Sequence, residues 1–445
     1  MSDSIYIITY ILFILTIHSL SSLKIAYKGN YIGLFAMSII ILFSLSKLSG
    51  NFLIFSILSI ILGATFGIFI AYKIKMQNLP QMVAILNSLG GLSSGLIGIA
   101  EITSFHLNSP LILLIIILGF TTFSGSIASF VRLNNSFNIK DISTIKIITF
   151  MFFITMIITS FYAYNSNTKY ILGLSLITII WGFLFILPIG GADMPIIISI
   201  LNSLSGWTTV LVGFSINNYL LIITGTLVGS SGIILTYVMT KAMNRNLIHI
   251  IFNYIHSIPN NNTTNSFKNI HLGTPKDVAF LMENANKIII IPGFGMASSN
   301  AQHELVNLSK ILKEKYNVDV KFAIHPVAGR MPGHMNILLA EADVDTNIVF
   351  ELKDINQEFK TTDIAYVIGA NDITNPLAKT LPDSPIYKMP ILEVEDAKKI
   401  IFVKRSLSPG YAGLDNPLFY KENTIMLQGD AKEITMQIIA ELEQN

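Results

Sequence analysis

A glycine-rich turn is the first feature of this sequence that is suited to binding chemistry. The apolar run KIIIIP leads into Gly293, Phe294 and Gly295, and Ser298 follows three residues later. Gly293 permits a tight turn, Gly295 lets the backbone approach a pyrophosphate, and the helix that follows presents N–H groups to an anion. The pattern predicts a dinucleotide-binding turn, and a glycine-rich turn without a ligand is the alternative.

Two strand ends indicate which dinucleotide this turn would bind. NAD-binding domains commonly place a carboxylate at the end of the second strand, where it holds the ribose 2′-hydroxyl. Here the strand VKFAIHP ends at His325 with nothing acidic beside it, whereas Lys404, Arg405 and Ser406 close the later strand KKIIFVKRS. Because Arg binds phosphate through two parallel hydrogen bonds, the pattern favours NADP(H). A solvated basic strand end is the alternative.

Two flexible loops accompany these strand ends. In the first, HPVAGRMPGH, the two histidines have a spacing that matches no compact zinc motif, so no metal ion is expected and a phosphate or nicotinamide contact through Arg330 is predicted. The second, SPGYAG, contains Gly410 and Tyr411 and is suited to fold over a bound cofactor, with an ordinary surface loop as the alternative. The chain has no cysteine, which excludes disulfides and thiolate chemistry.

Alternating strands and helices must position these residues. We predict five strands, in the segments KIIIIPGFG, VKFAIHP, AYVIGAND, KKIIFVKRS and NTIMLQGD. Helices are predicted at Met296–Tyr316 and Ala431–Glu443. This order predicts a soluble α/β domain over residues 274–445 with a doubly wound parallel sheet. The Asn-rich segment before it predicts a flexible linker over residues 246–273.

The composition of the N-terminal half is that of a membrane domain. Residues 1–245 contain 11 Lys and Arg but only four Asp and Glu, too few for a water-solvated surface. A membrane-spanning helix needs about 20 apolar residues. We predict about nine spans, at 4–21, 31–48, 52–72, 82–100, 110–131, 145–164, 170–188, 194–213 and 219–240.

The charges of the loops predict an orientation. Alternate connections contain nine Lys and Arg residues and the opposite connections contain two. Positive residues favour the cytoplasmic side, so the C-terminal domain is expected in the cytoplasm. The expected partner of the N-terminal half is the lipid bilayer, and no nucleic acid partner is expected.

Polar residues within spans are expensive in lipid and mark functional candidates. A hydrated path is the interpretation for Asn87, Ser126 and Asn202. Asp193 follows the break Ile-Gly-Gly-Ala at a helix end on the side of the soluble domain, and it is expected to take part in coupling. Glu101 is expected to be a solvated helix end near the opposite surface.

Seven segments together resemble one family, proton-translocating NAD(P) transhydrogenase. The segments are GGADMP (190–195), LNSLSGW (201–207), LVGSSGIILTYVMTKAMNR (227–245), PGFGMA, HPVAGRMPGHMNILLAEA (325–342), VIGANDITNP (367–376) and KRSLSPGYAGLDNPLF (404–419). They occur in collinear order over nearly the whole chain. The chain looks like the beta subunit of a split bacterial enzyme.

This resemblance implies an activity, partners and a location. Hydride would pass from NADH, bound to a partner alpha subunit, to NADP⁺ bound on this chain, in a Re/Si-specific reaction driven by inward proton movement. The soluble domain would be Rossmann-like and lie on the cytoplasmic side of the bacterial inner membrane. Two alpha–beta units would form a homodimer of half-enzymes.

The resemblance also implies the residues of the site. Asp372 matches an acidic position that links protonation to cofactor state. Many relatives have a membrane His where this chain has Asn87, and Asn cannot titrate, so which group carries the proton stays open. The implied cofactor-binding residues are Gly293, Phe294, Gly295, Val327, Ala328, Gly329, Arg330, Met331, Pro332, Gly369, Ala370, Asn371, Asp372, Ile373, Lys388, Met389, Lys404, Arg405, Ser406, Gly410, Tyr411, Gly429 and Asp430.

Two other functions remain open. A membrane transporter with a regulatory dinucleotide-sensing domain would need a solute site in its spans, and the spans offer no pair of opposite charges to hold an ionic solute. A non-catalytic assembly subunit would not need the nucleotide motifs.

Overall fold

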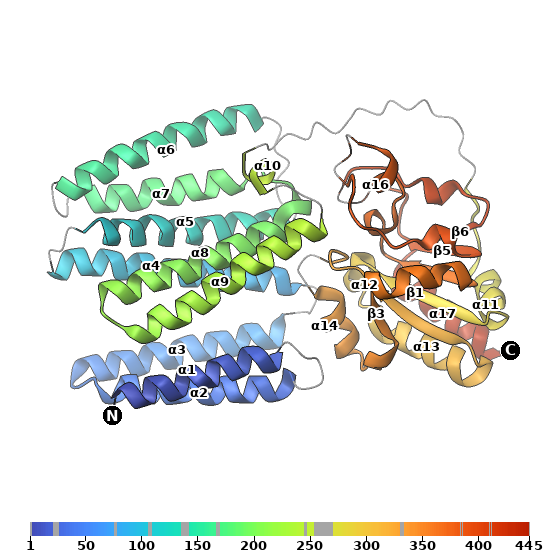
Figure 1. The fold of residues 1–445 in the computed structure, drawn as a ribbon, viewed down its shortest axis with the longest axis horizontal. Helices are drawn as coiled ribbons and strands as arrows, with labels where there is room; N and C mark the ends of the chain where they lie inside the picture. The colour runs from blue at the N-terminus through green and yellow to red at the C-terminus, as the bar shows by residue number, and fades with distance from the viewer. Residues whose placement is uncertain are drawn as a thin grey trace. The chain divides into compact units, whose positions relative to one another are not determined.

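The N-terminal half of the computed structural model is helical (Figure 1). The structure describes residues 2–20, 26–74, 78–105, 109–134, 142–165, 170–243, 247–252, 270–329, 333–382, 384, 386–408, 410 and 412–444. Among the described residues up to Met243, the long helices are α1 Ser2–Leu20, α2 Ala26–Ser46, α3 Asn51–Lys73, α4 Leu79–Phe105, α5 Pro110–Leu133, α6 Ile142–Asn165, α7 Ile171–Ile186, α8 Met194–Ser215 and α9 Tyr219–Ala242. Each predicted span coincides with one of these helices.

These helices make the chain a membrane protein. Over the described residues, seven of them are long and apolar enough to cross a bilayer, and α1 and α7 are shorter apolar helices. The predicted count of about nine spans is therefore approximate. None of the described side chains of α3 is buried, although the helix is almost wholly apolar. An apolar surface of this size needs a cover, which a lipid bilayer supplies.

Glycines let neighbouring helices approach at backbone distance. A Cβ atom built on Gly91 of α4 would lie 2.7 Å from the carbonyl oxygen of Gly119 in α5, and one on Gly206 of α8 would lie 2.3 Å from the amide nitrogen of Gly229 in α9. Both distances are too short for any larger residue. Small residues at such crossings are typical of packing between membrane helices.

The C-terminal domain contains a six-stranded sheet in the order β3-β2-β1-β4-β5-β6, and every pairing is parallel. The strands are β1 Lys287–Pro292, β2 Asp319–Ile324, β3 Val349–Glu351, β4 Ile364–Ile368, β5 Lys399–Lys404 and β6 Thr424–Gln428. The predicted doubly wound, Rossmann-like α/β fold is confirmed. The predicted number of five strands was one too few, because β3 is a three-residue edge strand without a distinct apolar pattern.

Helices and 3₁₀ turns connect the strands. The helices are α11 Pro275–Glu283, α12 Phe294–Ser299, α13 Gln302–Tyr316, α14 His334–Glu341, α15 Leu352–Ile355, α16 Leu377–Thr380 and α17 Ala431–Gln444. The prediction of one helix over Met296–Tyr316 was wrong. Asn300 adopts a left-handed conformation with φ 53°, and its N–H donates to Met296 and Ala297, which ends α12. The glycine turn is therefore followed by a helix of only six residues.

The predicted linker is only partly described. Residues 253–269 lie outside the described residues, and a short helix, α10 Leu247–Phe252, precedes them within the predicted linker range. The α/β domain then begins with a capping box at the start of α11, in which the Asp277 N–H donates to the Thr274 hydroxyl and the Thr274 N–H donates to the Asp277 carboxylate. Capping satisfies N–H groups that the first helical turn leaves free.

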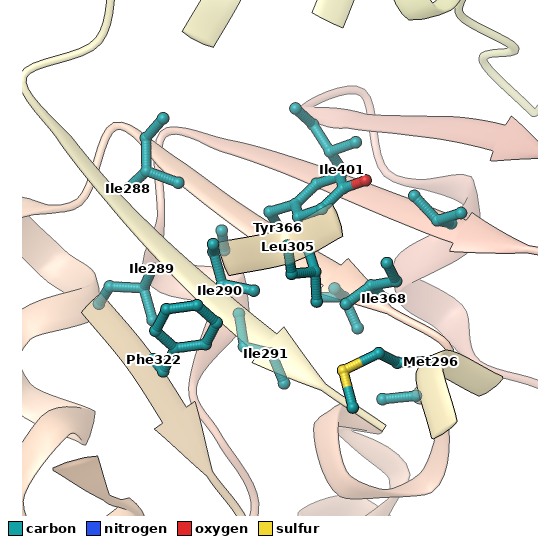
Figure 2. Packing of buried hydrophobic residues seen from close by; sticks show 14 of the residues in the cluster. Ile288, Ile289, Ile290, Ile291, Met296, Leu305, Phe322, Tyr366, Ile368 and Ile401 are labelled. Atoms are coloured by element: carbon teal, nitrogen blue, oxygen red, sulfur yellow. The ribbon is translucent and has the colours of Figure 1, made fainter. Parts of the chain in front are cut away.

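The sheet core explains the run of four isoleucines in β1. Ile288 to Ile291 are all fully buried, and Figure 2 shows them between Phe322 of β2 and Tyr366 of β4. A central parallel strand is covered on both of its faces, so it reads as a continuous apolar run rather than an alternating one. Burying each such side chain stabilises the fold by about 2 kcal/mol, and this rigid sheet positions the loops at its edge.

Candidate nucleotide-binding site

The predicted binding residues gather at the carboxyl edge of the parallel sheet. Gly293–Gly295 follow β1, Gly369–Ile373 follow β4, Lys404 ends β5, and Gly429 follows β6. These strands pair in the order β1-β4-β5-β6. In open parallel sheets, ligands bind outside the carboxyl ends of the strands, where the strand order reverses. That point here lies beside β1 and β4.

The glycine turns after β1 and β4 pack so closely that each leaves no space for a side chain on the other. The amide of Gly295 donates to the carbonyl oxygen of Gly369 at 2.8 Å. A Cβ atom on Gly295 would lie 2.5 Å from the Gly369 Cα, and one on Gly293 would lie 2.5 Å from the Gly369 carbonyl oxygen. Gly369 itself has φ 68°, which favours glycine. The first glycine turn therefore packs backbone to backbone on the turn after β4, in addition to forming part of the ligand cavity.

A cavity of about 250 Å³ opens between these turns. It is lined by Gly295, Ser298, Gly369, Asn371, Val403, Lys404, Arg405, Ser406, Ser408, Gly410, Gly429 and Ala431. Eight of these residues are predicted binding residues, and Ser298, Val403, Ser408 and Ala431 are additional. Ser298 could have been found from its third position in the glycine motif. Val403 and Ala431 gave no signal because small apolar residues beside a strand end are common.

The polar lining of the cavity is cationic and hydroxylic. Lys404 Nζ donates to the backbone carbonyl of Ser408 at 3.0 Å, and the hydroxyls of Ser406 and Ser408 are 2.9 Å apart. Burial lowers the pKa of Lys404, and the charges of Asp372 and Asp415 act in the opposite direction. Among the described residues that line the cavity none is acidic. The arrangement suits a phosphate group.

Arg405 is held in place by a carboxylate behind it. Its Nη2 and Nε donate to Oδ2 of Asp430 at 2.6 and 3.1 Å. Burial alone would raise the pKa of Asp430, but the bonds from Arg405 and from the Lys432 amide lower it. Asp430 also accepts the Lys432 amide at 2.9 Å at the start of α17. Asp430 thus orients the guanidinium rather than lining the cavity.

Asn371 is a buried amide among the residues that line the cavity. Asn371 is 8% exposed, and neither its Oδ1 nor its Nδ2 has a hydrogen-bond partner within the described part of the chain. Buried polar atoms without partners are rare and call for an explanation such as a ligand. A nucleotide that offers both donors and acceptors would satisfy this side chain, so the residues present fit a dinucleotide.

Asp372 lies beneath the loop that follows β5. Its Oδ2 accepts the backbone N–H of Ala412 at 3.0 Å, and a Cβ atom on Gly410 would lie 2.5 Å from its Oδ1. The loop that was predicted to act as a lid is therefore in contact with this carboxylate. A change of charge at Asp372 would act directly on the loop that carries Ser408 and Gly410 into the cavity.

Other predicted binding residues are not among those that line the cavity. Met389 is buried in a separate apolar cluster with Leu414, and Val327 packs against that cluster. Lys388 adopts a left-handed conformation with φ 58° and donates its N–H to Ala378. The other predicted binding residues that are described but do not line the cavity are Gly293, Phe294, Ala328, Gly329, Ala370, Asp372, Ile373 and Asp430. Arg330, Met331, Pro332 and Tyr411 lie outside the described residues.

His325 is a buried structural residue at the end of β2. It is 2% exposed, its Nε2 lies 2.7 Å from the carbonyl oxygen of Pro390, and its Nδ1 accepts the Val327 amide at 3.2 Å. A neutral ring with the proton on Nε2 satisfies both bonds. Burial lowers the pKa of His325 to about 4. His325 therefore joins the loop after β2 to the loop that contains Pro390.

Because the pKa of His325 is lowered in the folded chain, we expect the α/β domain to lose stability in mild acid. The unfolded ring takes up a proton near pH 6.5, whereas the folded ring does so only near pH 4. The contribution of the neutral, buried His325 ring to the free energy of unfolding is complete above pH 6.5 and is lost as the pH falls toward 4. It amounts to about 2 kcal/mol between pH 7 and pH 5. In His325→Gln, which keeps a donor for Pro390, the difference in urea midpoint of the detergent-solubilised chain between these pH values should shrink. An unchanged difference would contradict the assignment.

The predicted polar residues of the membrane half take different positions. Asn87 is 8% exposed and Ser126 is fully buried, whereas Asn202 is half-buried in α8. Asp193 ends a 3₁₀ turn that leads directly into α8. The expectation that Glu101 is a solvated helix end was wrong. Glu101 is only 7% exposed, because the end of α8 covers it.

Comparisons with known proteins match nearly the whole chain. A family model described as NAD(P) transhydrogenase beta subunit matches residues 2–441. The chain is 44% identical over 453 aligned residues to an NAD(P) transhydrogenase subunit beta of Rhodospirillum rubrum, covering 98% of this chain and 97% of that protein. A second protein of the same name, from a specified strain of Rhodospirillum rubrum, matches with the same identity and coverage.

Proposed function

Because the chain belongs to the family of NAD(P) transhydrogenase beta subunits, we propose that its cavity binds NADP(H). We further propose that the bound nucleotide exchanges hydride with NAD(H) on a separate alpha subunit. Binding of a nicotinamide dinucleotide by the enzyme follows from the family. The single observation that carries the assignment to NADP(H) is the pair Lys404 and Arg405 in a cavity whose described lining contains no acidic residue.

The ends of β2 and β5 support NADP(H) over NAD(H). A carboxylate at the end of β2 would be the partner of a ribose 2′-hydroxyl, but the buried His325 occupies that position with both ring nitrogens engaged. Lys404, Arg405 and the hydroxyls of Ser406 and Ser408 line the cavity on the side of β5. Charge-assisted hydrogen bonds from these groups hold the 2′-phosphate.

Within this proposal each group has a binding or orienting task. NADP(H) supplies the hydride chemistry when bound. Asn371 satisfies its buried amide on the nucleotide, and Gly295 and Gly369 let the two turns that line the cavity pack backbone to backbone. Asp430 orients Arg405. Asp372, in contact with the loop at Gly410 and Ala412, links its own protonation to the position of that loop.

The membrane half couples this reaction to proton movement, which is inward when NADH reduces NADP⁺. Differential affinity for NADP⁺ and NADPH is the free-energy link between the two processes. Asn87, Ser126 and Asn202 order water along the path, and Asp193 transmits the protonation state at the start of α8. An Asn side chain does not titrate, so another group must bind the proton.

The assembly follows the same proposal. The alpha subunit is the partner that carries NAD(H), and two alpha–beta units form a homodimer in the bacterial inner membrane with the α/β domain in the cytoplasm. The excess of basic residues on alternate loops supports this orientation.

Reconstitution with the alpha subunit tests the proposal. The two chains are placed in sealed vesicles with a pH-sensitive dye inside, and reduction of an NADP⁺ analogue by NADH is followed by absorbance. Hydride transfer accompanied by a change of lumen pH is expected. No hydride transfer with a competent alpha subunit would overturn the proposal, and solute flux regulated by nucleotide in its place would favour the transporter.

A further inference from the structure

A buried carboxylate stands where α4 meets the end of α8. Glu101 is 7% exposed, and its Oε2 accepts a hydrogen bond from the hydroxyl of Ser215, the last residue of α8. Its Oε1 is also buried and has no partner within the described residues. Ionisable groups inside a membrane domain are costly and mark ion or proton pathways. Glu101 therefore needs an explanation beyond packing.

Two buried polar residues of α4 lie in line with Glu101. Asn87 and Ser94 precede it by 14 and seven residues and are 8% and 6% exposed. Seven residues of an α-helix fall short of two full turns by about 20°, so the three side chains share one face. Along this face Asn87 and Glu101 are separated by about 21 Å of helix. The three polar side chains are therefore spread over most of a membrane thickness.

Two contacts place this face of α4 against α8. A Cβ atom built on Gly90, which is on the same face, would lie 3.0 Å from the hydroxyl oxygen of Ser205 in α8. Glu101 meets Ser215 ten residues later in α8. We name this contact the α4–α8 seam. It is defined by Gly90 and Glu101 of α4 with Ser205 and Ser215 of α8, together with Asn87 and Ser94, which lie on the same face of α4, the Ser94 hydroxyl donating to the Gly90 carbonyl oxygen. The seam is a row of amide and hydroxyl groups that ends on one carboxylate.

The described helices α5 to α9 contain few titratable residues. α8 has no titratable residue, and neither has α7. In α5 the one charged residue is Arg132, in the last turn. The titratable residues of α6 are Lys146, Tyr162 and Tyr164, and those of α9 are Tyr219, Tyr237 and Lys241. Among the described residues, none of these groups forms an ion pair or a hydrogen bond with Glu101.

We propose that Glu101 is the proton-exchanging group of the α4–α8 seam and that Ser215 is its positioning residue. This inference rests on the proposed proton coupling and deepens it. Uptake of the proton forms an O–H bond at Oε1, and release breaks the same bond, so no electrons are exchanged. The amide and hydroxyl groups of the seam donate and accept hydrogen bonds to water between these events, and Ser215 holds Oε2 so that Oε1 faces the seam.

Substitution of Glu101 in the reconstituted alpha–beta complex tests the proposal. Glu101→Gln keeps the volume and a hydrogen-bond acceptor for Ser215 but cannot titrate, and Glu101→Asp keeps the titrating group. Thr103→Val, at an exposed threonine two residues away on α4, is the matched control. The rate of hydride transfer coupled to lumen pH change and the NADPH affinity are measured for each, together with the infrared band of a protonated carboxyl group on changing pH.

Glu101→Gln is expected to lower the coupled rate roughly a hundredfold, the usual scale for losing a positioned proton-transfer group. It should also lose one carboxyl band while binding NADPH as the wild type does. Glu101→Asp should retain more of the rate than Glu101→Gln, Ser215→Ala should shift the pH profile of the rate, and Thr103→Val should change nothing. If the wild type and Glu101→Gln showed the same rate of hydride transfer coupled to the change of lumen pH, the inference about Glu101 would be overturned and the proposed function would stand. If the wild-type complex showed no hydride transfer, the proposed function and the inference would both be overturned.

Discussion

Replacing Gly369 with Ala is expected to disrupt the carboxyl edge of the sheet more than replacing any other glycine of that edge with Ala. The new Cβ atom would lie 2.3 Å from the Cα of Gly295, and the residue would keep a φ of 68°, which an L-residue rarely adopts. Left-handed strain contributes about 1 kcal/mol, and the forced separation of two backbones adds to it. We expect a total of about 3 kcal/mol, with hydrogen exchange of the β1 and β4 amides about a hundredfold faster.

Gly333→Ala is the matched control for this prediction. Gly333 has a φ of 69°, and no described atom lies within 4 Å of its Cβ position. The substitution therefore adds the left-handed strain without the clash, and the expected cost is about 1 kcal/mol. Equal effects of the two substitutions on amide exchange would show that the contact between the two glycine turns is unimportant.

Neutralising Lys404 and Arg405 together is expected to abolish the distinction between NADPH and NADH. Each charge-assisted hydrogen bond to a phosphate contributes about 1.5–3 kcal/mol. The variant Lys404→Gln/Arg405→Gln should therefore bind NADPH at least about a hundredfold more weakly, while the affinity for NADH changes little. Equilibrium titration of the detergent-solubilised full chain, using the fluorescence of the reduced nicotinamide, measures both dissociation constants.

Lys399→Gln provides the control for charge alone. Lys399 is an exposed residue at the first position of β5, at the opposite end of the strand from Lys404. Its removal lowers the net charge of the domain without touching the cavity, and the NADPH affinity should stay unchanged. If the double variant still preferred NADPH as strongly as the wild type, the basic strand end would not be the 2′-phosphate site.

The features that could be predicted from the sequence are those with a strong local pattern. Long apolar runs in the N-terminal half predicted the nine long helices α1 to α9 of the described residues, and the isoleucine run before Gly293 predicted the central strand β1. The glycine turn and the basic strand end stood out because glycine and paired cations at strand ends have few structural uses. Since all these strands are parallel, their carboxyl ends had to meet at one edge.

The features that could not be predicted depend on tertiary contacts. Asn300 breaks the helix after the glycine turn, although asparagine in a helical pattern is no strong signal of an end. The edge strand β3 has three residues and pairs only with β2. Glu101 lies near a helix end, where a carboxylate is usually solvated, and only the position of Ser215, 114 residues later, shows that it is covered. Such contacts have no local signature.

Binding of NADP(H) by this chain is tested by the ratio of the NADH and NADPH dissociation constants of the wild-type chain, purified without an alpha subunit. We expect one nucleotide per chain and NADPH binding at least about a hundredfold tighter than NADH, as two charge-assisted bonds to the 2′-phosphate require. Equal affinities, or a preference for NADH, would contradict the assignment of the cavity beside Lys404 and Arg405 to NADP(H).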